Sequence, residues 1–559
     1  MKQAETPGLP APDRELDPAR AAARDSLRIA VWTLVSRLTG VLRIAAIGAV
    51  LGPTLLGNTF QFANSLPNLI YYGFLAGSLF SSLLVPTLVL TTDAGDRRGA
   101  ERIAGGFLGT VLAALTVAAC AAVLVGPWLL RIGALGSEDA AAGSAQEQAG
   151  RLLLLLLAPQ VLLYAVVGTS TAVMNARRRF ALAAAAPAVE NIGILVVLGL
   201  VAALYGTGGG LESVPTSELV LLGVGATASV ALHAALQWWG ARRAGVTLRP
   251  RAGWRDAEVR ALVRRALPAV ALAGATALQA LVLLVLANRV PGGVVAVQMG
   301  LTFYTLVVAL GVTPVALSLL PRLSRLSADG DDEGFRDALG RGLALALFVT
   351  VPAAVGYVLV ARPLAETIAI GRMSSHAGAL LIAGTIAALA PGLVGDGVFK
   401  VLTYACYAQG DTRTPLRSMT VQAAAFLLLA GCAFLVPPAA VPLALALAFS
   451  VANAVGAAHL AARWGRDLTG LGARLQPTVR RVLAGVALMA IPVWVVTKVV
   501  PRALEGRAGW TLALATAVLL GMAVFLLLQA WWRAPELAWL RAGARGRAPV
   551  PGQAGGGPA

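Results

Sequence analysis

The chain has 559 residues, of which 58% are hydrophobic and 13% are charged, and its formal net charge is +18. A soluble domain carries about 25% charged residues and only short apolar runs, so this composition excludes an ordinary soluble protein. Apolar runs of helical length recur from end to end without the alternating polarity of membrane barrel strands. The sequence therefore predicts an all-α polytopic membrane protein, whose positive charge serves cytoplasmic loops rather than nucleic acid.

About fourteen segments are long and apolar enough to be transmembrane helices. They lie near residues 28–51, 59–91, 104–130, 152–175, 181–205, 217–240, 267–289, 294–321, 340–361, 376–408, 415–436, 440–463, 479–500 and 509–532. Arginines gather in the N-terminal tail and in the even-numbered connections, whereas the odd connections are short or mixed in charge. This alternation predicts that both termini lie in the cytoplasm.

Three pairs of segments resemble each other at nearly constant separation. The pairs begin at Leu84 and Leu319, at Asn175 and Tyr407, and at His233 and His459, with offsets of 235, 232 and 226 residues. An even number of helices per repeat keeps both repeats in one orientation. We therefore expect two six-helix halves around a central cavity, related by an axis along the membrane normal, which is typical of transporters.

The predicted organisation has six parts. They are a disordered cytoplasmic tail (1–26), an N-terminal six-helix half (27–241), an amphipathic cytoplasmic linker (242–266), a C-terminal six-helix half (267–465), two additional helices (466–532) and a cytoplasmic tail (533–559). The basic linker suits either a surface helix between the halves or a plain positive-inside anchor. Cys120, Cys406 and Cys432 have no metal-ligand spacing and are expected to be packing residues, so no metal or cofactor is predicted.

Two arginines near the middle of the first predicted span are the strongest candidates for a binding site. Arg37 and Arg43 lie about 12 Å from the nearer end of that span. A cation at this depth costs about 2.5–3.5 kcal/mol unless it faces a bundle interior or a wet cavity; the alternative is snorkelling to the headgroups. Because guanidinium groups suit phosphate oxygens, we expect an anionic headgroup as ligand, with Ser36 on the face of Arg43 as a hydroxyl partner.

Three other charged residues lie deep within predicted spans. Lys400 follows Asp396 by four residues on one helical face, so it either pairs with Asp396 or contacts the ligand. Glu190 is either a counter-ion to one of the two arginines or a protonatable coupling group.

Four uncharged or weakly basic side chains in the spans receive structural interpretations. His233 and His459 are interpreted as packing or interface residues, and Asn191 and Gln279 as hydrogen-bonding residues between helices. In the connection at 409–415, Asp411 and Thr412 are expected to cap the next helix.

Several motifs together resemble a known family. They are Ser36-Arg37-x-x-Gly40-x-x-Arg43, Leu66-Pro67-Asn68, Val85-Pro86, Pro187-x-x-x-Asn191, Leu320-Pro321-Arg322-Leu323-Ser324, and Lys400-Val401-Leu402 followed by Tyr407 to Pro415. In this order and spacing, over about residues 27 to 530, the chain resembles the MurJ/MviN lipid II flippases. That family belongs to the multidrug/oligosaccharidyl-lipid/polysaccharide exporter superfamily.

The resemblance implies a multi-pass protein of the bacterial inner membrane that is not an enzyme. By alternating access it would move an undecaprenyl-diphosphate-linked disaccharide-pentapeptide, lipid II, to the outer leaflet, driven by membrane potential or ion coupling. A cationic central cavity would hold the diphosphate, and spans 13 and 14 would form a groove for the polyprenyl tail. The expected partners are this lipid, membrane lipids and cell-wall synthesis proteins. A further set of residues is expected to form either structural turns or a gate between the two states: Pro67, Asn68, Asp411, Thr412, Arg413 and Pro415. We call this set the gate or turn motif.

The chain departs from the family pattern at three places, and these leave alternatives open. Asn58 stands where an acidic residue is common, Tyr71 and Tyr72 where arginines follow the Pro-Asn pair, and Leu301-Thr302-Phe303 where span 8 often has an arginine. One alternative is an exporter of another lipid-linked glycan or of a small amphiphile. The other is a non-transporting scaffold in cell-envelope assembly.

Overall fold

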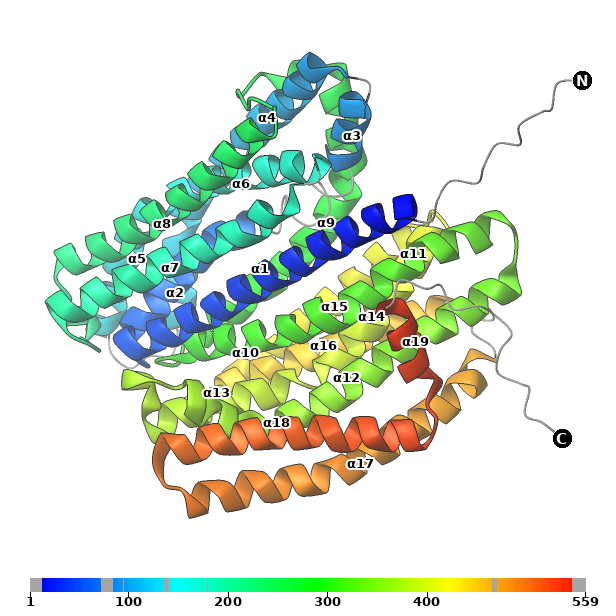
Figure 1. Cartoon of the computed structure of the whole chain (residues 1–559). Coiled ribbons are helices and arrows are strands. Elements are labelled where there is room, and N and C mark those ends of the chain that lie inside the picture. Colours follow the sequence, from blue (N-terminus) through cyan, green and yellow to red (C-terminus); the bar gives the residue numbers. More distant parts are fainter. Residues whose placement is uncertain are drawn as a thin grey trace, which may run out of the picture.

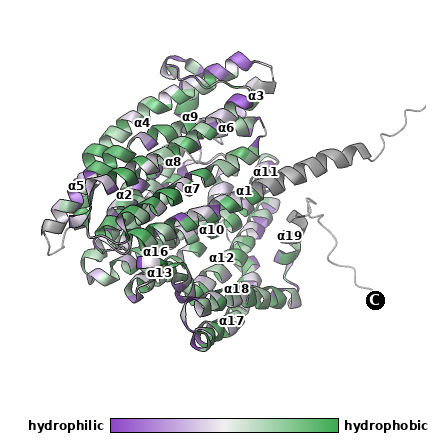
Figure 2. Cartoon of the chain, turned by 60° about the vertical axis from the view of Figure 1, so that its left-hand side comes forward, coloured by the Kyte–Doolittle hydropathy of each residue, from purple (hydrophilic) through white to green (hydrophobic). Residues whose placement is uncertain are grey.

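The structure, a computed structural model, describes residues 13–71, 84–93, 95–134, 140–177, 179–464 and 470–544. In these residues all regular secondary structure is helical, and the long helices run side by side across the molecule (Figure 1). Hydrophobic residues cover the flanks of the helices, while hydrophilic residues gather near their ends, for example around α3 and the start of α4 (Figure 2). The prediction of an all-α polytopic membrane protein is confirmed.

The helices fall into three groups along the chain. The first comprises α1 (Asp13–Leu51), α2 (Leu55–Tyr71), α3 (Val85–Asp93), α4 (Arg97–Ala134), α5 (Ala140–Leu157), α6 (Pro159–Ala176), α7 (Phe180–Tyr205) and α8 (Thr216–Arg243). The second comprises α9 (Ala257–Ala287), α10 (Gly293–Val307), α11 (Thr313–Ala328), α12 (Asp332–Ile368), α13 (His376–Leu389), α14 (Gly392–Ala408), α15 (Arg413–Gly431) and α16 (Val441–Trp464). The third comprises α17 (Leu471–Ala503), α18 (Gly506–Trp531) and α19 (Pro535–Ala544).

Twelve helical segments of the described residues are long and apolar enough to cross a membrane. The seventh predicted span corresponds to α9, whose apolar part, Ala273–Ala287, is shorter than a full span. The second predicted span, near 59–91, falls partly on residues outside the described ranges. The count of fourteen therefore stays a prediction.

Three of the predicted spans are interrupted helices. The fourth is divided into α5 and α6 next to Pro159, and the tenth into α13 and α14 next to Pro391. The eighth consists of α10 and α11 joined by a π-helical segment, Val308–Val312. Proline lacks a backbone donor and clashes with the preceding turn, which accounts for the first two breaks.

The two halves share a hydrophobic core at one end of the bundle and have separate cores at the other. Ile47, Leu51 and Leu56 belong to one buried cluster with Val290 and Val294 of the second half. Away from that end, one cluster consists of residues of α2 to α9 and another of residues of α11 to α17. We call the joined end the closed end.

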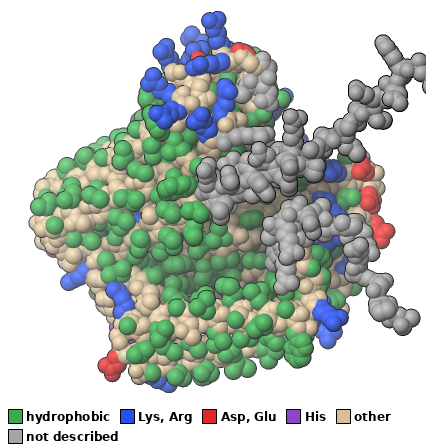
Figure 3. Space-filling model, viewed as in Figure 1, with side chains coloured by type: hydrophobic (Ala, Val, Ile, Leu, Met, Phe, Trp, Pro, Cys, Tyr) green, Lys and Arg blue, Asp and Glu red, His purple; other side chains and the backbone are tan. Residues whose placement is uncertain are grey.

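The opposite end carries most of the exposed arginines and is called the basic end. Figure 3 shows a dense group of Lys and Arg side chains there, above a flank of hydrophobic residues. The exposed arginines of the basic end include Arg98, Arg242, Arg243, Arg249, Arg251, Arg255, Arg260, Arg264 and Arg265. A basic end and an apolar flank fit a protein that crosses a membrane.

The linker differs from the surface helix that the sequence suggested. Residues 246–252 are extended and are followed by a single 3-10 turn, Gly253–Arg255, before α9 begins. Pro250 and Gly253 disfavour a helix here, whereas the side chain of Asp256 accepts a hydrogen bond from the Glu258 amide and caps α9. The extended part lies on α4, where the amide of Arg251 donates to the Gly105 carbonyl at 3.0 Å.

Candidate functional site

A cavity of about 1170 Å³ lies between the two halves. Its walls come from α1, α2, α6, α7 and α8 on one side and from α9, α10, α11, α14, α15 and α16 on the other. It extends from Thr33, Ala183 and Tyr407 near the basic end to the level of Gln61 and Leu284. The cavity therefore enters the bundle from the basic end.

Polar contacts between the halves close the opposite end. The Asn58 side-chain amide donates to the Val290 carbonyl at 2.7 Å, and its oxygen accepts from the Val294 amide at 3.1 Å. Gln146 of α5 donates to the Asn288 side chain at 3.0 Å. Asn58, one of the departures from the family pattern, thus joins α2 to the start of the second half.

Helix α1 places the predicted ligand-binding residues at the cavity. Ser36, Arg37 and Arg43 all line it. Arg37 is exposed and makes no hydrogen bond or ion pair with any residue in the described ranges. Gly40, between the two arginines, could allow either a local break or a close helix approach, and α1 continues through it without a break.

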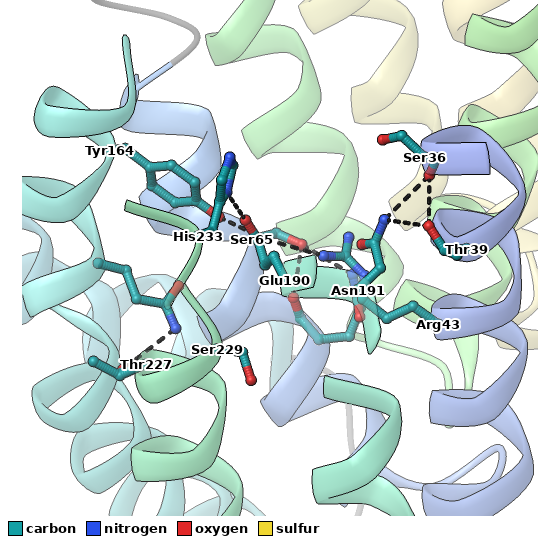
Figure 4. A network of polar contacts seen from close by, with 12 residues as sticks. Ser36, Thr39, Arg43, Ser65, Tyr164, Glu190, Asn191, Thr227, Ser229 and His233 are labelled. Carbon is teal, nitrogen blue, oxygen red and sulfur yellow. Dashed lines mark hydrogen bonds and ion pairs between the residues drawn. The ribbon is translucent and has the colours of Figure 1, made fainter. Parts of the chain in front are cut away.

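Arg43 belongs to a polar network centred on Glu190 of α7 (Figure 4). Its Nη1 lies 3.3 Å from Glu190 Oε1, and the Tyr164 hydroxyl of α6 donates to the same oxygen at 2.9 Å. His233 Nδ1 lies 2.8 Å from Glu190 Oε2. Of the two predicted partners, Glu190 pairs with Arg43, and it is buried at the cavity wall.

Two polar residues have surroundings that the sequence did not predict. His233 is an interface residue, one of its two predicted roles, since it contacts Glu190 of α7, but its contact is with a carboxylate and it also lines the cavity, neither of which was expected. Gln279 also lines the cavity, and its buried Nε2 has no hydrogen-bond partner among the described residues. Asn191 does join helices, since its amide donates to the Ser36 carbonyl at 3.2 Å and to Thr39 at 3.1 Å.

The C-terminal half contributes one ion pair and a neutral network. Lys400 Nζ lies 3.6 Å from Asp396 Oδ2, and both side chains are half-buried at the cavity. Gln422 donates to the Asn453 oxygen at 2.6 Å, and the Asn453 amide donates to the Tyr304 hydroxyl at 2.9 Å. The local sequence gives no signal for this amide network, although Gln422 lies 232 residues after Glu190, the offset of the second repeat pair.

The residues of the predicted gate or turn motif are separated in space. Asn68 lines the cavity, while Pro67 is buried within α2. Asp411 lies at the basic end, where its side chain accepts from the amides of Arg413 (2.9 Å) and Thr414 (3.0 Å).

Two expectations about capping and packing are wrong in part. Thr412 makes no capping bond with its side chain, so Asp411 alone caps α15, with Pro415 buried in its first turn. Of the three cysteines, only Cys406 is buried, whereas Cys120 and Cys432 are exposed.

The described wall of the cavity carries a small positive charge. Its cations are Arg37, Arg43 and Lys400, and its anions are Glu190 and Asp396, which gives a net charge of +1 with His233 neutral. Each anion pairs with one cation, so Arg37 is left uncompensated. In the described residues there is no cluster of three or more His, Cys, Asp or Glu side chains suited to a metal ion.

The fold and the cavity define a class: polytopic membrane transporters built from two helical halves. A solved structure described as a lipid II flippase MurJ in an inward closed conformation matches 90% of this chain and 98% of its own, with a TM-score of 0.67 and 17% identity. An inward-facing MATE family multidrug transporter of the MOP superfamily matches 80% of this chain and 94% of its own, with a TM-score of 0.55 and 13% identity.

The family follows from the sequence comparisons. The family model described as lipid II flippase MurJ matches residues 47–507, so the chain belongs to that family. A probable lipid II flippase MurJ of Rhizobium meliloti (strain 1021) is 26% identical over 469 residues, covering 83% of this chain and 84% of the relative. That of Haemophilus influenzae (strain ATCC 51907 / DSM 11121 / KW20 / Rd) is 25% identical over 401 residues, covering 69% and 76%. The family description names transport and no enzymatic reaction.

Proposed function

We propose that this chain moves lipid II across the bacterial inner membrane by alternating access. The observation that carries the proposal is the pair Arg37 and Arg43 on the wall of a cavity between the halves, with Arg37 unpaired among the described residues. The diphosphate of the cargo is anionic, and arginine donates to phosphate oxygens in a bidentate manner. Membership of the MurJ family supports lipid II as that cargo.

The basic end faces the cytoplasm in this proposal, and both termini lie there. The positive-inside rule supports this orientation, because the exposed arginines gather at that end. The cavity then receives its cargo from the inner leaflet. For release outside, the contacts of Asn58 with Val290 and Val294 must break while the halves approach each other at the basic end.

The polyprenyl tail stays in lipid beside α17 and α18, which pack against α12. These two helices expose large apolar side chains such as Leu483, Ile491, Leu519 and Leu527. A hydrocarbon chain lying along such a face would keep its apolar surroundings while the headgroup occupies the cavity.

The ion pairs of the cavity disfavour export of a cationic small amphiphile. Such cargo needs a free carboxylate, but Glu190 and Asp396 each pair with a basic residue. The other alternative, a cell-envelope scaffold that transports nothing, predicts that expression of this chain does not restore the exposure of lipid II in the functional test.

The test is complementation in a host depleted of its own flippase. Expression of this chain should restore outward exposure of lipid II, detected with a periplasmic probe. Arg37→Ala and Arg43→Ala should abolish the rescue, whereas Arg325→Ala, at an exposed arginine outside the cavity, should retain it. Rescue by both cavity variants would contradict the site, and failure of the wild type at normal membrane levels would contradict the cargo.

A further inference from the structure

We propose that His233 takes up a proton when anionic cargo binds. The Glu190 carboxylate then forms its ion pair with the protonated His233 instead of with Arg43, and Arg43 is released to bind the cargo. His233 is then a positioning residue that acts through Glu190 and Arg43. The inference rests on the proposed flippase function and adds a pH dependence to its binding step.

Glu190 holds three donors, and Arg43 is the least committed of them. The Nδ1 of His233 and the hydroxyl of Tyr164 lie 2.8 and 2.9 Å from the carboxylate oxygens, whereas Arg43 Nη1 lies 3.3 Å away. Within the part of the chain that the structure describes, the buried Nε of Arg43 has no hydrogen-bond partner. Arg43 is therefore the donor most easily exchanged for a new anion at the cavity wall.

The neighbour of His233 can accommodate the ring both neutral and charged. Gln237 Nε2 lies 3.4 Å from His233 Nε2, so it donates to a neutral ring that carries its proton on Nδ1. The side-chain oxygen of Gln237 is buried, and no described residue donates a hydrogen bond to it. A half-turn of this amide would present the oxygen to the N–H that protonation creates on His233 Nε2.

Few other charged side chains lie close to Glu190 and His233. The helices packed against α7 are chiefly α1, α8 and α6, which contribute Arg43, His233 and Tyr164 respectively. On α2 the facing polar groups are the neutral Gln61 and Ser65, together with Tyr71, whose ring stacks on Tyr164 at 5.3 Å. Among the described cavity-lining residues of these helices, Arg37 is the one further charged side chain. It lies six residues from Arg43, or about 9 Å along α1.

Charge balance supports a proton at this place. The described cavity wall has a net charge of +1 with His233 neutral, while a diphosphate esterified at both ends carries −2. A proton on His233 raises the charge of the wall to +2 and lets Glu190 stay paired after Arg43 leaves. The proton comes from water in the cavity, which enters from the basic end, and returns to it when the cargo departs.

The repeat supplies a matched control in the other half. His459 occupies the position related to His233, but its Nδ1 contacts the Ser418 hydroxyl at 2.9 Å rather than a carboxylate. His459 does not line the cavity. Its replacement should leave the binding of cargo unchanged.

The experiment measures the affinity of the purified full chain in detergent for purified lipid II between pH 5.5 and 8. The doubly esterified diphosphate keeps its charge over this range. Wild type and His459→Gln should bind about tenfold more tightly at the acidic end, a typical size for coupling between two sites. His233→Gln should bind with the weak high-pH affinity throughout, and Glu190→Gln with the tight affinity throughout, because Arg43 is then free.

The outcomes separate the inference from the proposed function. Binding that is equally pH-dependent in His233→Gln, or pH-independent in the wild type, would overturn the inference and leave the flippase function standing. Absence of binding by the wild type at every pH would overturn both. Should Glu190→Gln not fold, His233→Lys replaces it, since a fixed cation at 233 should give tight binding throughout; weak binding by that variant would contradict the mechanism.

Discussion

The sequence offsets predict that the two halves are repeats, but the halves carry different side chains at one corresponding position. Glu190 on α7 and Gln422 on α15 are 232 residues apart, and both line the cavity. Glu190 bonds a cation, a phenol and an imidazole, whereas Gln422 donates to Asn453, which in turn donates to Tyr304. One half therefore has an ionisable network where the other has a neutral one.

This difference indicates how the halves divide their work. A neutral amide network keeps its hydrogen bonds at any pH, so it can support the wall of the C-terminal half in every state. A carboxylate shared by several donors has more than one arrangement of similar energy, and an arriving anion can select between them. We therefore expect changes in the N-terminal network to alter function and changes in the C-terminal network to alter mainly stability.

The largest effect is expected from Arg43→Gln, which removes the permanent cation beside Glu190. With His233 neutral, that carboxylate keeps only uncharged donors, which should lower the free energy of unfolding by about 3 kcal/mol, because an unpaired buried charge is costly. The double variant Arg43→Gln/Glu190→Gln should recover most of this stability but not the rescue of lipid II exposure. Thermal unfolding in detergent measures the first effect and complementation the second. A double variant no more stable than Arg43→Gln would show that the pair does not matter energetically.

A smaller effect is expected from Gln422→Leu in the C-terminal half. The Asn453 oxygen loses its donor, which should cost about 1.5 kcal/mol in the free energy of unfolding. Asn453 still donates to Tyr304, so the wall should keep its shape and the pH dependence of lipid II binding should be that of the wild type. If Gln422→Leu changed that pH dependence as strongly as His233→Gln, the division between the halves would be wrong.

The sequence was sufficient to predict the helical class, the cavity and its arginines. These features depend on local properties: the length of apolar runs and the cost of a cation far from water. Arg37 and Arg43 could be identified because the sequence of α1 itself gives no other reason for two cations so deep in an apolar helix. The alternation of arginines between connections is equally local, and it predicted the basic end.

The partners of those arginines could not be predicted, because they depend on how distant helices pack. His233 lies on α8 and Tyr164 on α6, and only the tertiary structure brings both to Glu190. A lone histidine in an apolar helix predicts a packing or interface residue, and nothing in the local sequence indicates a carboxylate as its partner. The first part of the linker differs from the predicted surface helix for another reason: the amphipathic helix begins only at Ala257, because Pro250 and Gly253 disfavour a helix in the preceding residues.

The smallest effect concerns the helix starts that precede Glu190 and Gln422. Arg179 precedes α7 without a side-chain cap, while Asp411, at the same repeat position, accepts from the amides of Arg413 and Thr414. Burial raises the pKa of Asp411, but its hydrogen bonds with Thr414 and Arg413 outweigh this, so the pKa lies below its usual value. The charged cap therefore stabilises the fold above the unfolded pKa of about 3.9, and this contribution is lost as the pH falls through the lowered pKa.

Asp411→Ala should accordingly lower the free energy of unfolding by about 1 kcal/mol at pH 7, the usual cost of losing such a cap. The deficit should shrink when thermal unfolding in detergent is repeated at a pH below the lowered pKa. Arg179→Ala, the matched change in the other half, removes no cap and should leave stability unaltered at both pH values. If Asp411→Ala lost no more stability than Arg179→Ala, the start of α15 would be held by packing around the buried Pro415 rather than by the carboxylate.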